Sequence, residues 1–112
     1  MSATPFDTGL PPDELDLERP APIETPWGAF AVFDRGDALV AVDCWCPHMQ
    51  GPLMQGTRRG DELACPWHGW RFSLVDGRCT WAPAEADRSA RVRLLRVEVS
   101  PTGTVLLHPP EE

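Results

Sequence analysis

Thirteen prolines are distributed along this chain of 112 residues, and they restrict the folds that are open to it. A proline inside an α-helix costs about 3 kcal/mol, because its nitrogen has no proton to donate and its ring clashes with the preceding turn. Nine glycines add further positions for turns. We therefore expect no long helices, and short strands joined by tight turns instead.

The order of apolar runs and turn residues predicts an all-β fold of antiparallel strands. Apolar runs at 29–34 and 38–43 flank Arg35-Gly36-Asp37, which is typical of a hairpin. A second pair at 90–99 and 104–108 is joined by a segment that contains a proline and a glycine. Shorter strands are expected at 63–65, 70–73 and 78–81, the last after an Asp-Gly turn. Residues 1–8 are expected to be loosely held.

The net charge of −7 excludes several classes of partner. Nucleic acids and anionic membranes attract basic proteins, so neither is an expected partner, and any protein partner is expected to present a basic surface. Residues 1–15 lack the basic start and apolar stretch of a secretory signal. The longest apolar runs have five residues, whereas a membrane-spanning helix needs roughly 20. We expect a cytoplasmic monomer, in which four cysteines indicate metal or redox chemistry before disulfides.

Two short segments combine one cysteine with one histidine each. Cys46-Pro47-His48 is the first, and Cys65-Pro66-Trp67-His68 is the second. Prolines and glycines flank both segments, so we expect two rigid loops that each present one sulfur and one nitrogen. Thiolate and imidazole ligands suit zinc or iron–sulfur chemistry.

A structural zinc site is the alternative to an iron–sulfur cluster, because two cysteines and two histidines also build zinc fingers. Zinc fingers usually place the two cysteines in one element and the two histidines in another. Here each loop supplies one of each, which suits a two-iron cluster with both cysteines on one iron and both histidines on the other. The sequence favours the two-iron cluster.

At these segments the chain resembles the Rieske family. The residues that carry the resemblance are Cys46-Pro47-His48-Met49-Gln50-Gly51-Pro52-Leu53, Gly56, and Cys65-Pro66-Trp67-His68-Gly69-Trp70-Arg71-Phe72. The resemblance implies one [2Fe–2S] cluster per chain, with Cys46 and Cys65 on the inner iron and His48 and His68 on the outer iron. It also implies a single Rieske domain over 1–112, built of stacked antiparallel sheets, with a cluster-binding subdomain of two hairpin loops at about 44–83.

The chain departs from the respiratory branch of this family. That branch adds a cysteine to each loop and joins them by a disulfide, but the matching positions here are Gly51 and Trp67. It also places serine and tyrosine hydroxyls near the cluster, where this chain has Trp70 and Phe72. The resemblance is therefore to the ferredoxin and oxygenase branch, and it implies a cluster of low potential.

The remaining cysteines and aromatic residues are assigned more simply. Cys44 and Cys79 are expected to be buried free thiols, which behave as small hydrophobic side chains. We assign Trp70, Phe72 and Trp81 to the core and His108 to a solvated or capping role. Residues near the cluster that either shield it or serve only as packing groups are Trp45, Met49, Trp67 and Pro83.

The function that this resemblance implies is one-electron transfer by a protein that is not itself an enzyme. Its partners would be a flavin-dependent reductase as donor and a terminal oxygenase as acceptor. A small Rieske subunit of a nitrite-reductase-like or other redox complex is one alternative, and a zinc-stabilised binding module is the non-redox alternative. Direct oxygenase activity needs a second iron site of two histidines and a carboxylate, and only His108 remains for it.

Overall fold

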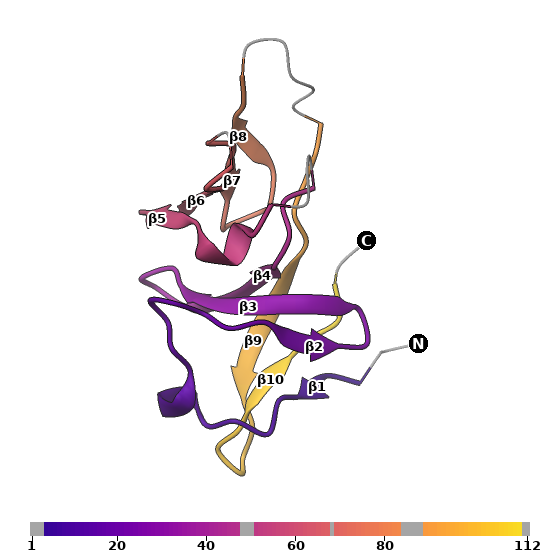
Figure 1. The fold of residues 1–112 in the computed structure, drawn as a ribbon. Coiled ribbons are helices and arrows are strands. Elements are labelled where there is room, and N and C mark those ends of the chain that lie inside the picture. Colours follow the sequence, from indigo (N-terminus) through magenta and orange to yellow (C-terminus); the bar gives the residue numbers. More distant parts are fainter. Residues whose placement is uncertain (1–3, 48–50, 68, 84–88, 111–112) are drawn as a thin grey trace.

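The computed structural model describes residues 4–47, 51–67, 69–83 and 89–110, and in these residues it is built almost entirely of antiparallel strands (Figure 1). Two sheets account for the strands. The six-stranded sheet has the order β1-β10-β9-β4-β3-β2, and the four-stranded sheet has the order β5-β6-β7-β8. The all-β architecture of stacked antiparallel sheets is therefore confirmed.

The strands and the two short 3₁₀ turns follow one another along the chain with few residues between them. The six-stranded sheet contains β1 (Phe6–Asp7), β2 (Ile23–Thr25), β3 (Gly28–Asp34), β4 (Leu39–Asp43), β9 (Leu94–Val99) and β10 (Val105–Leu107). The four-stranded sheet contains β5 (Thr57–Arg59), β6 (Glu62–Ala64), β7 (Arg71–Ser73) and β8 (Cys79–Trp81). The 3₁₀ turns are η1 (Pro12–Glu14) and η2 (Leu53–Gln55). None of these elements is a helix long and apolar enough to cross a membrane.

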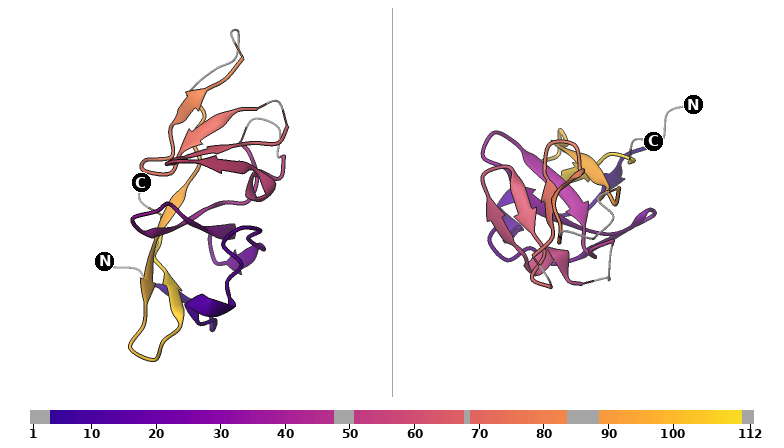
Figure 2. Two further views of the ribbon diagram at one scale, coloured as in Figure 1. Left: turned by 90° about the vertical axis from the view of Figure 1, so that its left-hand side faces the viewer. Right: turned by 90° about the horizontal axis from the view of Figure 1, so that it is seen from above.

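The hairpin of β3 and β4 separates two hydrophobic cores. Successive side chains of a strand point to opposite faces of the sheet. Phe30 and Val32 therefore enter one core, together with residues of β9 and β10, while Ala31 and Phe33 enter the other, beneath the four-stranded sheet. Burial on both faces explains why β3 is an almost continuous apolar run. The side view in Figure 2 shows the two sheets placed one above the other.

The four-stranded sheet is an insertion between two strands that pair directly. β4 and β9 are neighbours in the six-stranded sheet, with Val42 opposite Leu94, although the whole of β5 to β8 lies between them in the sequence. The chain enters the insertion after Asp43 and returns from it at Val92–Leu94. Both crossings occur at one place in the fold.

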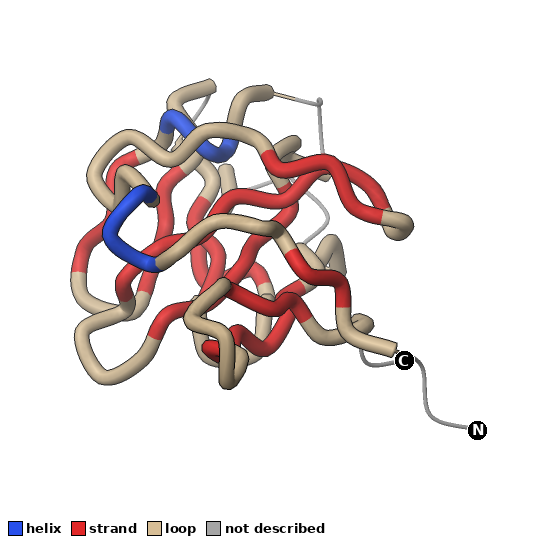
Figure 3. Tube along the Cα trace, turned by 90° about the horizontal axis from the view of Figure 1, so that it is seen from below, coloured by secondary structure: helices blue, strands red, loops and turns tan. Residues whose placement is uncertain are grey.

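The N-terminal segment is attached to the six-stranded sheet more firmly than expected. Phe6 and Asp7 pair with β10, and the Thr8 backbone N–H and hydroxyl both donate to the Val105 carbonyl, at 3.0 and 2.8 Å. The expectation that 1–8 are loosely held therefore differs from the structure at residues 6–8. The view from below in Figure 3 shows this edge strand leading toward the N-terminus.

Candidate metal centre

Two loops with the same closure carry the two cysteines that the sequence predicted as ligands. The Cys46 N–H donates to the carbonyl of Gly51 at 2.8 Å, and the Cys65 N–H donates to the carbonyl of Trp70 at 2.7 Å. Each bond joins a cysteine to the residue five positions later, so each loop is a short hairpin that begins at its cysteine. The prediction of two hairpin loops therefore holds for their described residues.

The two loops contact each other through a glycine. A Cβ atom added to Gly51 of the first loop would lie only 3.0 Å from the Trp67 ring of the second loop. Because real Cβ atoms rarely approach other atoms so closely, glycine is what lets the indole cover the first loop. In the respiratory branch this pair of positions is a disulfide, whereas here an aromatic ring packs on backbone.

Both cysteine residues are almost completely buried. Cys46 is 0% and Cys65 2% exposed, and they belong to the same hydrophobic core. Trp70 and Phe72 lie in this core with their rings stacked, 6.5 Å between centroids, which confirms two of the three aromatic core assignments. Two buried thiols at the starts of adjoining loops are a donor set that fits the sulfur-ligated iron of a two-iron cluster.

The two histidines of the predicted ligand set, His48 and His68, lie outside the described residues, as does Met49. The described residues accordingly contain no group of three metal-binding side chains. His108 lies elsewhere, at the end of β10, where its ring contacts Glu98 at 2.6 Å and Arg96 at 3.4 Å. The ligand set of Cys46, His48, Cys65 and His68 therefore remains a prediction.

Cys44 and Cys79 occupy different environments. Cys44 is fully buried, and loss of water around its thiol, with smaller contributions from Asp43 and Glu24, raises its pKa to about 12. Its thiol is therefore neutral at physiological pH, as expected of a packing residue. Cys79 on β8 is half-buried, and its sulfur lies 3.3 Å from the Trp81 carbonyl.

This difference predicts selective alkylation of the folded protein. At pH 8 iodoacetamide should modify Cys79 and leave Cys44 unmodified, because only thiolates that the reagent can reach react quickly. Peptide mass spectrometry measures both sites, and labelling of the urea-unfolded chain shows that Cys44 is intrinsically reactive. Equal labelling of the two cysteines in the folded protein would contradict the environment assigned to Cys44.

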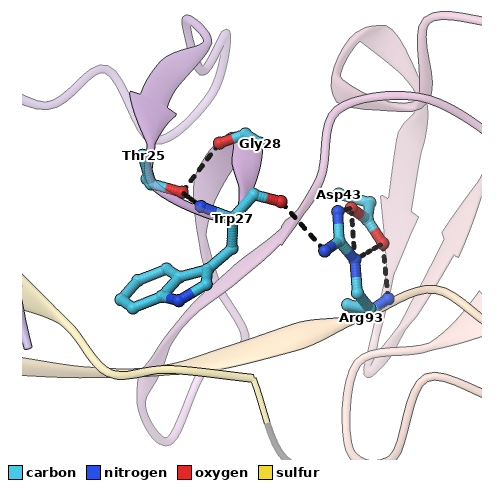
Figure 4. A network of polar contacts seen from close by, with 5 residues as sticks. All are labelled: Thr25, Trp27, Gly28, Asp43 and Arg93. Carbon is cyan, nitrogen blue, oxygen red and sulfur yellow. Dashed lines mark hydrogen bonds and ion pairs between the residues drawn. The ribbon is translucent and has the colours of Figure 1, made fainter. Parts of the chain in front are cut away.

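Arg93 links the segment that enters the insertion to the segment that returns from it (Figure 4). The Arg93 guanidinium contacts the Asp43 carboxylate at 2.8 Å, and the Arg93 backbone N–H donates to the same carboxylate at 2.6 Å. A further bond of 2.9 Å runs from the guanidinium to the Trp27 carbonyl in the β2–β3 turn. The strand that continues into Cys44 and Cys46 is thus anchored to the returning segment immediately before the first loop.

Three tryptophans near the loops are exposed, and one of them corrects a prediction. Trp81 was expected in the core, but it is 43% exposed, because it ends β8 at the edge of the four-stranded sheet. Its ring lies instead under the Arg71 guanidinium, 6.0 Å from the centroid. Trp45 and Trp67 are each 48% exposed, so each leaves a large part of its surface open to solvent.

Two antiparallel sheets and a pair of adjoining loops, each with a buried cysteine, define the class as a small β-protein with two thiols in one core. The family model that describes the Rieske [2Fe-2S] domain matches residues 10–101 of this chain. The chain belongs to the Rieske family, and its cofactor is a single [2Fe–2S] cluster. The two-iron alternative drawn from the sequence is thereby confirmed over the zinc alternative.

Relatives and solved structures fall into two groups. The chain is 38% identical over 94 residues to the oxygenase component of 3-ketosteroid-9-alpha-monooxygenase of Mycobacterium tuberculosis, covering 81% of this chain and 24% of that protein. It is 43% identical over 75 residues to 4beta-methylsterol monooxygenase of Methylococcus capsulatus, covering 65% of this chain and 20% of that protein. The chain thus spans about a quarter or less of the length of these curated relatives.

The ferredoxin of carbazole 1,9a-dioxygenase from Nocardioides aromaticivorans IC177 represents the second group. It superposes with a TM-score of 0.76 at 26% identity, covering 96% of this chain and 99% of that one. Dicamba monooxygenase gives the same TM-score at 25% identity, but there the match covers 34% of its chain. The fold is therefore shared by ferredoxins and by larger oxygenases.

Proposed function

We propose that this chain is a one-electron carrier that passes electrons from a flavin-dependent reductase to a terminal oxygenase and is not itself an enzyme. The observation that carries this proposal is the correspondence with the carbazole dioxygenase ferredoxin over 99% of that protein. A cytoplasmic monomer with a single domain, including a cluster-binding subdomain at about 44–83, is part of the proposal.

The residues proposed to hold the cluster are Cys46, His48, Cys65 and His68. The cluster, when bound, supplies reversible one-electron redox chemistry. The chain's own part is to hold and shield it. Backbone hydrogen bonds close the loops that begin at Cys46 and Cys65 and so position their two sulfurs. The core around Trp70 and Phe72 excludes water from the side of the cluster that faces the cysteines. The Arg93–Asp43 contact anchors the strand that leads to the first loop.

A second candidate is supported by the curated relatives, which are oxygenase components. In that case the chain would deliver electrons as the Rieske part of an oxygenase rather than as a separate ferredoxin. A small Rieske subunit of a nitrite-reductase-like complex is a further alternative of the same redox class. All three share the electron-carrying role and differ in the partner that receives the electron.

Reconstitution with purified components tests the proposal. A flavin-dependent reductase and a terminal oxygenase are combined with this chain, and product formation is measured against NADH consumption. We expect product only when all three proteins are present, and none when Cys46→Ser replaces the native chain. Product formation without this chain would overturn the ferredoxin assignment, and product formation by this chain with the reductase alone would overturn its assignment as a non-enzyme.

The cluster is expected to have a reduction potential at the low end of the range for Rieske centres, about −150 to +300 mV. Hydrogen-bond donors to the cluster sulfurs stabilise the reduced form, and this chain has Trp70 and Phe72 where the high-potential branch has hydroxyls. Protein-film voltammetry at pH 7 measures the potential. A value above about +100 mV would place the chain with the high-potential centres.

A further inference from the structure

Three of the five large apolar side chains that the described residues expose border the two cysteine loops. They are Trp45, Trp67 and Trp81, whereas the other two are Val75 and Val99. The three tryptophans are between 43% and 48% exposed. Exposed indoles grouped at one functional site indicate a surface that binds another protein, because large aromatic side chains are enriched at protein interfaces.

Each of these tryptophans is held against a loop by a specific contact. Trp45 forms an isolated β-bridge with Pro52 across the mouth of the first loop. The Trp67 ring covers Gly51, and a Cβ added to Gly69 in the second loop would lie 3.8 Å from the Trp81 ring. The Trp67 and Trp81 rings thus lie against the loops in the unbound chain, and side chains that are already in place lose less entropy on binding.

Charged side chains are sparse among the residues that the structure describes at this end of the four-stranded sheet. Among the described residues of 44–57, 64–72 and 79–83, Arg71 is the only charged side chain. Its guanidinium lies over the Trp81 ring at 6.0 Å. The carboxylates of this sheet belong to Asp61, Glu62 and Asp76, which lie at the opposite ends of the strands. The two turns there are adjacent, because the Leu74 N–H donates to the Asp61 carbonyl.

The acidic excess of the chain lies in another part of the fold. Residues 1–43 contain nine carboxylates and two arginines, which together equal the whole net charge of −7. These residues form the N-terminal segment and the six-stranded sheet. Glu18 and Asp34 do approach the insertion, in a groove that they share with Thr57 and Arg58, so an arginine accompanies them there. Net charge therefore does not describe the surface around the loops.

We propose that Trp45, Trp67 and Trp81, together with Arg71, form the surface by which this chain docks its redox partner, and that the partner presents an apolar patch with a carboxylate at its rim. The inference rests on the proposed electron-carrier function. It replaces the basic partner surface expected from net charge with one that is complementary to indoles and a single guanidinium. Aromatic side chains and arginine are the residues that most often dominate binding energy at an interface.

The test measures how fast the dithionite-reduced protein is oxidised, by anaerobic stopped-flow, with three cobalt(III) complexes that imitate parts of this partner. Tris(phenanthroline)cobalt(III) is an aromatic cation, hexaamminecobalt(III) is a hydrophilic cation of equal charge, and tris(oxalato)cobaltate(III) is a hydrophilic anion. The variants are Trp45→Ala, Trp81→Ala and Arg71→Gln. Val75→Ala and Val99→Ala are the matched controls, because they shorten exposed apolar side chains elsewhere.

We expect each tryptophan variant to slow oxidation by the phenanthroline complex about two- to tenfold, the effect of losing one aromatic contact, and to leave the hexaammine rate unchanged. Arg71→Gln should slow only the oxalato complex, and the two valine controls should change nothing. Trp67→Phe serves as an additional variant, because removal of the whole Trp67 ring would uncover Gly51.

Two results would overturn the docking surface. Equal slowing with all three oxidants would mean that the tryptophans act on the cluster itself, and no slowing with the phenanthroline complex would mean that they bind nothing. Failure of the electron-carrier proposal is distinguishable, because it would appear in the reconstitution as product formation without this chain, whatever the rates measured with the cobalt complexes.

Discussion

Purified Cys46→Ser, His48→Ala, Cys65→Ser and His68→Ala proteins are expected to lack both visible absorption and the EPR signal of a reduced mixed-ligand cluster. Each change removes one of the four proposed ligands, and the serine hydroxyl is a poor substitute for a thiolate on iron. Binding of a metal centre is coupled to the folding of small domains. We therefore also expect the midpoint of thermal unfolding to fall in each variant.

Cys44→Ala and Cys79→Ser are the matched controls for these ligand variants. Cys44 is two positions from Cys46 but is buried with a pKa of about 12, and Cys79 is half-buried on β8. Both variants should keep two irons and two sulfides per chain by chemical analysis. Loss of colour in either control, or its retention in any of the four ligand variants, would show that the ligand set is assigned incorrectly.

Gly77→Ala should lower the free energy of unfolding by about 3 kcal/mol, the sum of two separate costs. Gly77 has φ of +80°, a left-handed conformation that costs an L-residue about 1–2 kcal/mol. A Cβ at this position would also overlap the carbonyl oxygen of Val92, and overpacking of this kind typically costs about 1–3 kcal/mol. Chemical denaturation followed by tryptophan fluorescence measures the change.

Gly60→Ala separates the two costs. Gly60 also has a left-handed conformation, with φ of +61°, but an added Cβ there meets no atom within 4 Å. Its variant should therefore lose only the conformational part, about 1–2 kcal/mol. If both variants lost the same free energy of unfolding, the close approach of the 74–77 turn to the returning segment would contribute nothing to the cost of Gly77→Ala.

The strands that the sequence predicted best are those with a buried face. The hairpin of β3 and β4 was expected within one residue of its observed bounds, because its apolar runs and its Arg35-Gly36-Asp37 turn agree. β1, β2 and β5 were missed. Each has three residues or fewer, and the three residues of β5 are all exposed, so they form no apolar pattern. Such strands are fixed by the partner strand with which they pair.

The predicted strand over 90–99 begins later than expected, and the reason is local. Residues before β9 are drawn away from the six-stranded sheet by the insertion: the Val92 N–H donates to Gly77, and Arg91 pairs with Arg78 in an isolated bridge. The strand proper starts at Leu94. A pattern of apolar residues records burial, but not the sheet against which a residue is buried.

The candidate site was predicted unevenly. The spacing of Cys46 and Cys65 within turn-rich segments was enough to predict two loops, and their closing hydrogen bonds agree with it. Two contacts were not predicted: the packing of the Trp67 ring on Gly51, and the ion pair between Arg93 and Asp43. Both are contacts between residues at least 16 positions apart, and no local pattern in the sequence encodes them.

The direct pairing of β4 with β9 has a consequence for the order of folding. A contact such as Val42 with Leu94 closes a loop of about fifty residues, and an unstructured loop of that length costs about 3.5 kcal/mol in chain entropy. The hydrogen bonds from Met54 to Cys44 and from Val92 to Gly77 gather the two ends of this loop within the inserted sheet. Prior folding of the insertion would therefore lower the entropic barrier to closing the larger sheet. In terms of contact order, we therefore expect the inserted sheet to form before the pair of strands that brackets it in the sequence.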